Sequence, residues 1–223
     1  MNYCLIGAPG VGKGTFSKLL VLRLKLHHIS VGDIVRQEIT QKSNIGKQAL
    51  KFVNKGTLIP DDIVSQIVEK EMKKFQISNI LLDGYPRNIN QAKQLDQHLS
   101  TLSAISIQVD REVSVEKLLG RRVCAGCDRS FNMADIRRDG YDMPAILPGE
   151  HKTCPLGEPK CAERRVLEMR SDDTRDTIMK RFEVFDRETA PVLKYYRDSH
   201  RLKVFHVKRG VDDIDDLVKV MLS

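Results

Sequence analysis

The chain has 223 residues, 41% of them hydrophobic, and a formal net charge of +7. This length suits one domain with an insertion or a small satellite, and no apolar run approaches the roughly 18 residues of a membrane span. Five cysteines in a long chain without secretory features favour a reducing compartment over a disulfide framework. Because the first residues read as a strand, we expect no signal peptide and a cytoplasmic protein; a mitochondrial or plastid protein is the alternative if a targeting segment was removed.

Apolar runs alternate with helical patterns along the chain, which predicts βαβ crossovers and a parallel sheet. Four apolar runs read as buried strands, at 3–6, 79–82, 104–109 and 203–207. Helical spacing of apolar residues falls over 13–25, 30–41, 46–54, 61–75, 90–99, 111–122, 171–198 and 211–222. We expect Pro191 to kink or break the long helix over 171–198. The stretch 123–169 holds four of the five cysteines and little periodicity, which indicates an irregular inserted subdomain.

The run GAPGVGKGT lies between the first strand pattern and the first helix pattern. Its residues are Gly7, Ala8, Pro9, Gly10, Val11, Gly12, Lys13, Gly14 and Thr15. Strand, GxxxxGK and helix are the parts of a phosphate-binding loop, in which glycines let backbone N–H groups converge on an oxyanion and the lysine adds a charge. An ordinary glycine-rich turn is the alternative, but the lysine spacing and both flanking elements favour the phosphate loop. Gly14 stands where the general motif has the Ser or Thr that binds magnesium.

Two further segments place charged side chains near the predicted sheet edge. The strand over 79–82 is followed by Asp83, where phosphate-loop proteins hold magnesium, and by Arg87 after a Gly-Tyr-Pro turn. Ligands of open α/β sheets bind at the carboxyl ends of strands, so both side chains are candidate site residues. The segment from Ser30 to Arg36 offers a small loop and another arginine. Taken alone, these segments also fit a plain turn and a surface arginine.

The segments GAPGVGKGT, ISVGDIVR, GTLIPD, DGYPRNINQA, GRRV and RSDDTRDTIMKRF occur in the order seen in adenylate kinases and span nearly the whole chain. The sequence therefore resembles the adenylate kinase family, in its form with a long lid. The resemblance implies an α/β fold of the P-loop NTPase type, with a parallel five-stranded sheet flanked by helices. It also implies a core over 1–29, 61–121 and 162–223, an inserted AMP-binding helical segment over 30–60 and a lid over 122–161.

The resemblance also assigns roles to matching positions. For ATP it implies the loop from Gly7 to Thr15 with Lys117, Arg121, Arg209 and Val211. For AMP it implies Ser30, Val31, Arg36, Gly56, Leu58, Ile59, Val64, Gly84, Arg87, Gln91, Arg170 and Arg181, with Gln91 reading the adenine. The implied catalytic residues are Lys13, Arg87, Arg121, Arg170, Arg181 and Asp83, the last ordering the hydration shell of Mg²⁺. Asp172 and Asp173 match an acidic pair near the lid hinge.

The implied activity is the reversible reaction ATP + AMP = 2 ADP. Its nucleophile is a phosphate oxygen that is already ionised, so the reaction needs positioned cations and a closing lid but no general base. Arg170 and Arg181 are eleven residues apart, close to three helical turns, so both can face one cleft. Val31 replaces the usual threonine and Lys117 replaces a lid arginine. These departures leave a GTP:AMP phosphotransferase or a UMP/CMP-type kinase as alternatives.

The insertion contains Cys124, Cys127, Cys154 and Cys161. The first pair has the two-residue gap of a zinc knuckle, and the second pair has a gap of six residues. Lids of many adenylate kinases carry zinc on two such pairs, so the resemblance implies a structural Zn²⁺, with His151 able to replace one thiolate. A lid without metal is the alternative. We interpret Cys4 as a core residue, and His27 and His28, at a helix–strand junction, as structural or surface residues.

A basic, zinc-bearing P-loop protein that binds nucleic acid is the rival from another class. The CxxC pair and the net charge of +7 support it. The insertion, however, has only Phe131 and Tyr141 as aromatic residues and so offers no stacking platform for bases. We therefore expect the partners to be ATP, AMP and ADP, and we expect a monomer that contacts neither nucleic acid nor membrane.

Overall fold

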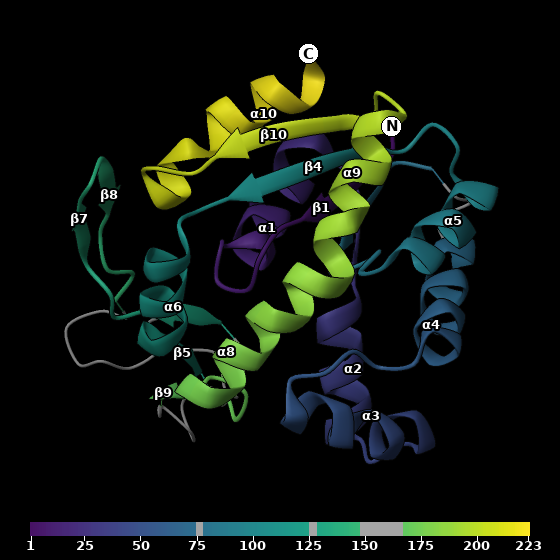
Figure 1. The fold of residues 1–223 in the computed structure, drawn as a ribbon, viewed down its shortest axis with the longest axis horizontal. Helices are drawn as coiled ribbons and strands as arrows, with labels where there is room; N and C mark the ends of the chain where they lie inside the picture. Colours follow the sequence, from purple (N-terminus) through teal and green to yellow (C-terminus); the bar gives the residue numbers. More distant parts are fainter. Residues whose placement is uncertain (75–77, 125–128, 148–166) are drawn as a thin grey trace.

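The computed structural model describes residues 1–74, 78–124, 129–147 and 167–223 (Figure 1). At its centre lies a five-stranded sheet of order β10-β4-β1-β3-β2, in which every neighbouring pair is parallel. Its strands are β1 (Tyr3–Ile6), β2 (His27–Ser30), β3 (Ile80–Asp83), β4 (Ser103–Gln108) and β10 (Leu202–His206). The predicted α/β fold with a five-stranded parallel sheet is confirmed.

Strand β2 is the one strand of this sheet that the apolar pattern did not locate. It lies at the sheet edge and pairs with β3, from His27 opposite Ile80 to Ser30 opposite Asp83. Of its four residues only Ile29 is buried, so its sequence HHIS carries no apolar run. An edge strand has one strand neighbour and needs fewer apolar residues, which is why composition alone hides it. The two histidines lie on this strand rather than at a junction.

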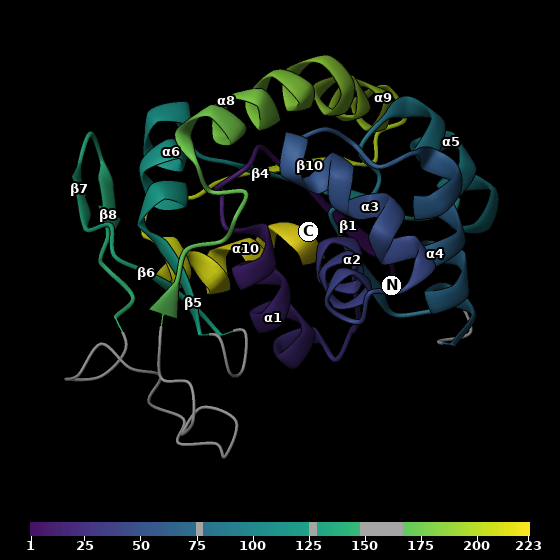
Figure 2. The same ribbon diagram turned by 90° about the horizontal axis from the view of Figure 1, so that it is seen from below.

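Helices cover both faces of the sheet (Figure 2). Cys4 and Ile6 of β1 pack into a cluster with residues of α5 and α9, whereas Tyr3 and Leu5 pack into a second cluster with residues of α1 and α10. This alternation follows from the two-residue period of a strand. The helices are α1 (Lys13–Leu24), α2 (Val31–Thr40), α3 (Asn44–Lys55), α4 (Asp61–Lys74), α5 (Ile89–His98), α6 (Arg111–Gly120), α8 (Arg175–Val184), α9 (Ala190–Asp198) and α10 (Ile214–Leu222). No helix within the described ranges combines the length and apolarity needed to cross a membrane.

The long C-terminal helix predicted over 171–198 is shorter and interrupted. It begins at Arg175, because the hydroxyl of Thr174 accepts a hydrogen bond from the N–H of Thr177 and caps the helix. A π-helical turn, η1 (Phe185–Thr189), then separates α8 from α9. Pro191, in the first turn of α9, has no N–H to donate and cannot continue the regular ladder. The α-helical pattern is thus interrupted just before Pro191 by the π-helical turn, but the chain stays helical, and Figure 1 shows α8 and α9 as one continuous, curved helix.

The insertion is more regular than predicted. The strands β5 (Arg121–Cys124), β6 (Ser130–Asn132) and β9 (Leu167–Glu168) form an antiparallel sheet, and β7 (Ile136–Arg138) pairs with β8 (Tyr141–Met143) in a hairpin. The expectation of an irregular subdomain is wrong for these segments, and Arg121 and Arg122 belong to a strand, not to the predicted helix over 111–122. The hairpin turn is Asp139–Gly140, with φ of 53° and 76°. This Asp-Gly pair is a sequence feature typical of two-residue hairpin turns, and it predicts the hairpin once it is noticed.

The β7–β8 hairpin packs on the core. The hydroxyl of Tyr141 accepts a hydrogen bond of 3.0 Å from the N–H of Asp110, just before α6. The N–H of Asp142 donates to the carbonyl of Lys208, just after β10, at 2.9 Å. Met143 is buried among the residues that pack with α1 and α10. These contacts bring part of the insertion beside the carboxyl ends of β4 and β10.

Candidate active site

The phosphate loop joins β1 to α1 at the carboxyl edge of the sheet. Gly10 and Gly12 have φ of 87° and 96°, which L side chains rarely adopt. A Cβ on Gly10 would also lie 2.4 Å from the carbonyl oxygen of Ser114 in α6. The loop therefore curls tightly beneath α6. The Lys13 ammonium folds back into it and donates to the carbonyls of Gly7 and Ala8 at 2.6 and 2.9 Å.

The Lys13 ammonium is surrounded by cations. Burial, followed by the charges of Arg87, Arg181 and Arg121, lowers the pKa of Lys13 from 10.5 to about 7, although Asp83 opposes the shift. Removal of the ammonium from water is the largest cause of this shift, and the three guanidinium groups add to it. The site is thus built for a ligand with several negative charges.

Asp83, at the end of β3, is buried and faces the start of α1. A Cβ on Gly14 would lie 3.4 Å from its Oδ2, and Nε2 of His28 lies 3.9 Å from the same oxygen. A Cβ at Gly14 would thus start at ordinary contact distance from the carboxylate. A carboxylate at this edge supplies oxygen atoms that can bind Mg²⁺ or accept hydrogen bonds from its water ligands. Asp83 thus fits a magnesium–nucleotide complex.

A cavity opens beside the phosphate loop, between the loop and the helices α2, α3 and α4. Its walls include every residue expected to bind AMP except Ser30 and Arg170, and also Gly7, Pro9 and Lys13 of the loop. Further lining residues that were not predicted are Leu5, Ile6, Gly32, Val35, Val53, Thr57, Pro86, Asp172, Val184, Phe185 and Thr189. Its lining combines apolar side chains with the guanidinium groups of Arg36, Arg87 and Arg181. It is suited to a flat ring with a phosphate attached.

Ser30, which does not line this cavity, has a local role instead. Its hydroxyl accepts a hydrogen bond from the N–H of Asp33 and caps α2. Asp33 in turn forms an ion pair with Arg36 one turn later. The segment therefore presents the Arg36 guanidinium on the cavity side with a carboxylate beside it.

Gln91 is buried and both ends of its carboxamide are engaged. Its Oε1 accepts a hydrogen bond of 2.7 Å from the N–H of Arg87, and its Nε2 donates at 2.6 Å to Asp61. The Arg87 Nε donates to the carbonyl of Gly84 at 2.8 Å. The expected reading of an adenine by Gln91 stays a prediction, since here its amide holds neighbouring residues.

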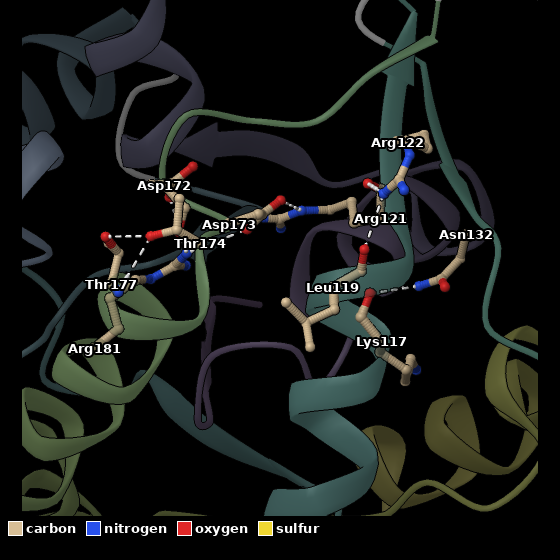
Figure 3. A network of polar contacts seen from close by, with 10 residues as sticks. All are labelled: Lys117, Leu119, Arg121, Arg122, Asn132, Asp172, Asp173, Thr174, Thr177 and Arg181. Atoms are coloured by element: carbon tan, nitrogen blue, oxygen red, sulfur yellow. Dashed lines mark hydrogen bonds and ion pairs between the residues drawn. The ribbon is translucent and has the colours of Figure 1, made fainter.

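An arginine cluster closes the other side of the phosphate loop (Figure 3). Arg121 of β5 forms two hydrogen bonds to the fully buried Asp173, at 2.8 and 2.5 Å. Arg181 of α8 pairs with Asp172 at 2.9 Å. Burial alone would raise the pKa of Asp172, but Arg181 and Arg121 outweigh it, so its pKa is lowered. The two carboxylates fix the direction of the guanidinium groups.

Arg170 joins this cluster without being on a helix. It precedes the Thr174 cap, so the argument that three helical turns separate it from Arg181 is wrong. Burial, then Arg121 and Arg36, lower the pKa of Arg170 to about 10, which places it near the other cations. The turn over 171–173, rather than helical periodicity, brings it there.

The residues expected beside the ATP base lie on the opposite side of the loop from the cavity. Lys117 of α6 lies over the loop, and its ammonium is 3.6 Å from the sulfur of Met143 in the hairpin. Val211 lies in the 3₁₀ turn η2 (Gly210–Asp213). The Arg209 guanidinium is paired with Asp213 and Asp216, at 2.7 and 2.6 Å. Its charge is thus already balanced within the protein.

The predicted zinc ligands cannot be compared with the structure, because Cys127, Cys154, Cys161 and His151 lie outside the described residues. Cys124 is buried in β5 beside Phe131 and Leu167. Within the ranges that the structure covers, no group of three or more His, Cys, Asp or Glu side chains could hold a metal ion. Cys4 is fully buried in β1, which confirms it as a core residue.

A strand, a phosphate loop and a helix at the carboxyl edge of a parallel sheet, facing an arginine cluster and a partly apolar cavity, define a P-loop phosphotransferase that acts on nucleotides. Comparisons with known proteins agree. The sequence model of the adenylate kinase family matches residues 5–201. The chain belongs to the adenylate kinase family.

Several full-length relatives support this membership. A GTP:AMP phosphotransferase of Plasmodium falciparum (isolate 3D7) is 37% identical over 227 residues, which cover 100% of this chain and 96% of the relative. The adenylate kinase of Caldanaerobacter subterraneus subsp. tengcongensis is 34% identical over 230 residues, covering 100% and 97%. That of Clostridium tetani is 36% identical over 208 residues, covering 91% and 89%. The protein is thus a nucleoside monophosphate kinase that transfers phosphoryl groups among adenine nucleotides, with Mg²⁺ accompanying the nucleotide donor.

Proposed function

We propose that the protein catalyses ATP + AMP = 2 ADP, with ATP bound by the phosphate loop and AMP in the cavity lined by α2, α3 and α4. The AMP base would pack against Val31, Val64 and their apolar neighbours, and its phosphate would meet Arg36 and Arg87. The donor would reach the loop from the side of Lys117. The two phosphate chains would then meet at Lys13, between the cavity and the arginine cluster.

The reaction requires the protein to position the two nucleotides and to stabilise negative charge on the transferring group. An oxygen of the AMP phosphate forms a bond to the γ-phosphorus of ATP, the bond from that phosphorus to the bridging oxygen breaks, and its electrons leave on ADP. Lys13, Arg87, Arg121, Arg170 and Arg181 would offset the charge that gathers on the transferring group. Magnesium, when bound with the nucleotide, supplies further positive charge to the phosphates. Asp83 would hold its hydration shell in place.

One observation carries this proposal: Lys13 of the phosphate loop lines the same cavity as Arg36, Arg87 and Arg181, so that cations from separate elements face one space. A single phosphate monoester would leave much of that charge unbalanced. Two nucleotides meeting end to end would balance it and bring the reacting atoms together.

The closing motion also belongs to the proposal. We infer that residues 30–60 and the insertion over 122–161 move toward the core when nucleotides bind. Arg36 lies on the first segment and Arg121 borders the second, so such motion would bring cations around the phosphates and exclude water.

The test is a matrix of donors and acceptors. ADP formation should be fast with ATP and AMP, and much slower with GMP, CMP or UMP as acceptor. A compound that joins two adenosines through a phosphate chain should bind and inhibit. Fast hydrolysis of ATP in the absence of AMP, or no binding of the joined compound, would contradict the proposal.

GTP is the second candidate donor. The Lys117 ammonium has one hydrogen-bonding contact within the described residues, to a thioether that accepts only weakly. A lysine donates well to O6 and N7 of guanine, whereas adenine presents an amino group at the corresponding edge. The relative from Plasmodium falciparum, named a GTP:AMP phosphotransferase, points the same way. Comparing kcat/KM for ATP and GTP, each with AMP, separates the two donors.

We also propose a structural zinc in the insertion, on the chemistry of its four cysteines. Metal analysis after purification under reducing conditions should give one zinc per chain. Protein without bound zinc would contradict the proposal. A monomer in the cytoplasm that binds no nucleic acid stays a prediction.

A further inference from the structure

The main chain of Arg87 is held from both sides by buried side chains of other elements. Its N–H donates to Oε1 of Gln91 in α5 at 2.7 Å. Its carbonyl accepts a hydrogen bond of 2.8 Å from the hydroxyl of Thr189, which lies 102 residues away at the end of the π-helical turn. Few loop residues have both backbone groups fixed by side chains, so the position of Arg87 is over-determined.

Thr189 is 7% exposed and lines the same cavity as Arg87. A hydroxyl buried there can give its proton to few acceptors, and the Arg87 carbonyl is the one it reaches. Losing this donor would leave the part-buried carbonyl without that partner, which is unfavourable. The bond ties the helix that carries Arg181 to the loop that carries Arg87.

The Gln91 side chain, which accepts the hydrogen bond from the Arg87 N–H, is oriented by Asp61. Its carboxylate accepts hydrogen bonds from Nε2 of Gln91, at 2.6 Å, and from Nδ2 of Asn88, at 2.8 Å. Because the Gln91 amide nitrogen is used in this way, its oxygen faces the Arg87 N–H. The chain Asp61–Gln91–Arg87–Thr189 thus runs from the start of α4 to the start of α9.

Electrostatics explain why Arg87 needs such support. Its pKa is lowered first by desolvation and then by the neighbouring charge of Arg181, whereas Asp83 and Asp172 oppose the shift, so the two guanidinium groups repel each other. Before any phosphate arrives, this repulsion favours an Arg87 that swings away. A fixed main chain, together with the bond from Arg87 Nε to Gly84, opposes that movement.

We propose that Thr189 is a positioning residue that sets Arg87 for the phosphate of the acceptor nucleotide before that nucleotide binds. The inference deepens the function proposed above, since it takes the cavity as the AMP site. It concerns the phosphate end of that site and not the base end. It therefore predicts that loss of the hydroxyl harms recognition of the phosphate selectively.

The experiment compares Thr189→Val, which keeps the shape and removes the hydroxyl, with Thr189→Ser, which keeps the hydroxyl. We expect the Val variant to bind AMP about tenfold more weakly, and to turn over about 10- to 100-fold more slowly. Binding of adenosine, which lacks the phosphate, and the KM for ATP should stay within about twofold of wild type. The Ser variant should recover most of the AMP affinity and turnover.

Ser199→Ala is the matched control, because it removes a hydroxyl near the end of α9 whose hydrogen bonds, within the described residues, are to carbonyls of α9 and to Arg201. It should behave as wild type. Should Thr189→Val fail to fold, Thr189→Ala provides the same comparison of AMP with adenosine. Equal weakening of AMP and adenosine, an unchanged AMP affinity, or a Ser variant as poor as Val would overturn the inference. A wild-type protein that binds AMP but transfers no phosphoryl group to it would sink the proposed function instead, while the binding comparison still tests Thr189.

Discussion

At the scale of single residues, the charge of the Lys13 ammonium is incompletely balanced by the protein. Its ammonium has two loop carbonyls as partners, at 2.6 and 2.9 Å, and its pKa is lowered first by burial and then by three arginines. Carbonyl oxygens carry partial charges and cannot balance an ammonium as a phosphate does. A bound phosphate would therefore stabilise the Lys13 ammonium more than the loop carbonyls do, and this difference favours phosphate binding.

Nucleotide binding should take up a proton above neutral pH. In the free protein, the pKa of Lys13 is about 7, so much of the ammonium is deprotonated at pH 8. Bound phosphates would raise that pKa again and draw a proton from solution. Affinity for ATP should accordingly fall as the pH rises from 7 to 9, where the nucleotide itself is fully ionised. Calorimetry at pH 8 in buffers of different ionisation enthalpy measures the uptake, and equal apparent enthalpies in all buffers would rule it out.

Removing the Lys13 ammonium should separate activity from stability. We expect Lys13→Met to lower kcat by about 10²–10³-fold, since one preorganised donor at the reacting phosphate is lost. The free protein should be no less stable at pH 7, because burial and repulsion disfavour the charged form. The folded pKa lies below the unfolded value, so wild type gains stability relative to the variant as the pH rises from 7 toward 10. Denaturant titrations at both pH values test this, and a large loss of stability at pH 7 would contradict it.

At the scale of elements, the Asp172–Asp173 turn joins the insertion to α8. Asp173 is fully buried and accepts two hydrogen bonds from Arg121 of β5, and Arg181 lies 3.6 Å from the same carboxylate. The turn thus gathers cations from two elements before any nucleotide binds. A charged group buried in this way is tolerated only because it is paired.

Asp173→Ala should destabilise the fold strongly, by about 3–5 kcal/mol, because it leaves a partly buried guanidinium without its carboxylate. Asp186→Ala is the control: Asp186 pairs with Arg111 at 2.6 Å, but both side chains are about half exposed. Its loss should cost less than about 1 kcal/mol. Chemical denaturation of both variants gives the comparison, and equal losses would show that burial does not decide the value of the pair.

The apolar patterns in the sequence predict some of the helices and strands and miss others. The apolar runs located β1, β3, β4 and β10, because buried central strands need several consecutive apolar residues. They missed the edge strand β2, whose only buried residue is Ile29, and the short hairpin β7–β8. The last long helix was predicted to begin at residue 171, and the spacing argument treated Arg170 as part of the same helical face, because charged residues of a turn and of a helix look alike in sequence. Only the cap at Thr174 separates them.

At the scale of the whole molecule, the site lies between parts of the chain that are far apart in sequence. The phosphate loop follows β1, the cavity walls come from α2, α3 and α4, and the arginines arrive from β5 and α8. A ligand that contacts all of these at once binds the folded state alone. It should therefore stabilise the fold by mass action.

A compound that joins two adenosines through a phosphate chain should raise the melting temperature. At about 100 times its dissociation constant, the stabilisation is roughly 2.7 kcal/mol, which corresponds to about 5–10 °C for a chain of this size. AMP or ATP alone, at the same multiple of its own dissociation constant, should give the same shift, but at much higher concentration. Thermal unfolding followed by circular dichroism measures it, and no shift with the joined compound would mean that the two nucleotide sites are not continuous.

The sequence by itself determined the phosphate loop, the sheet class and the family, because these depend on local spacing: glycines before a lysine, a strand before and a helix after. It also named most of the residues that line the cavity, through segments whose order matches the family. Tertiary structure alone decided that Thr189 reaches Arg87, that the Gln91 amide is already engaged, and that Asp173 is buried beneath Arg121. The contacts Thr189–Arg87, Gln91–Asp61 and Asp173–Arg121 join residues tens of positions apart, and such contacts depend on how the elements pack, which local periodicity does not encode.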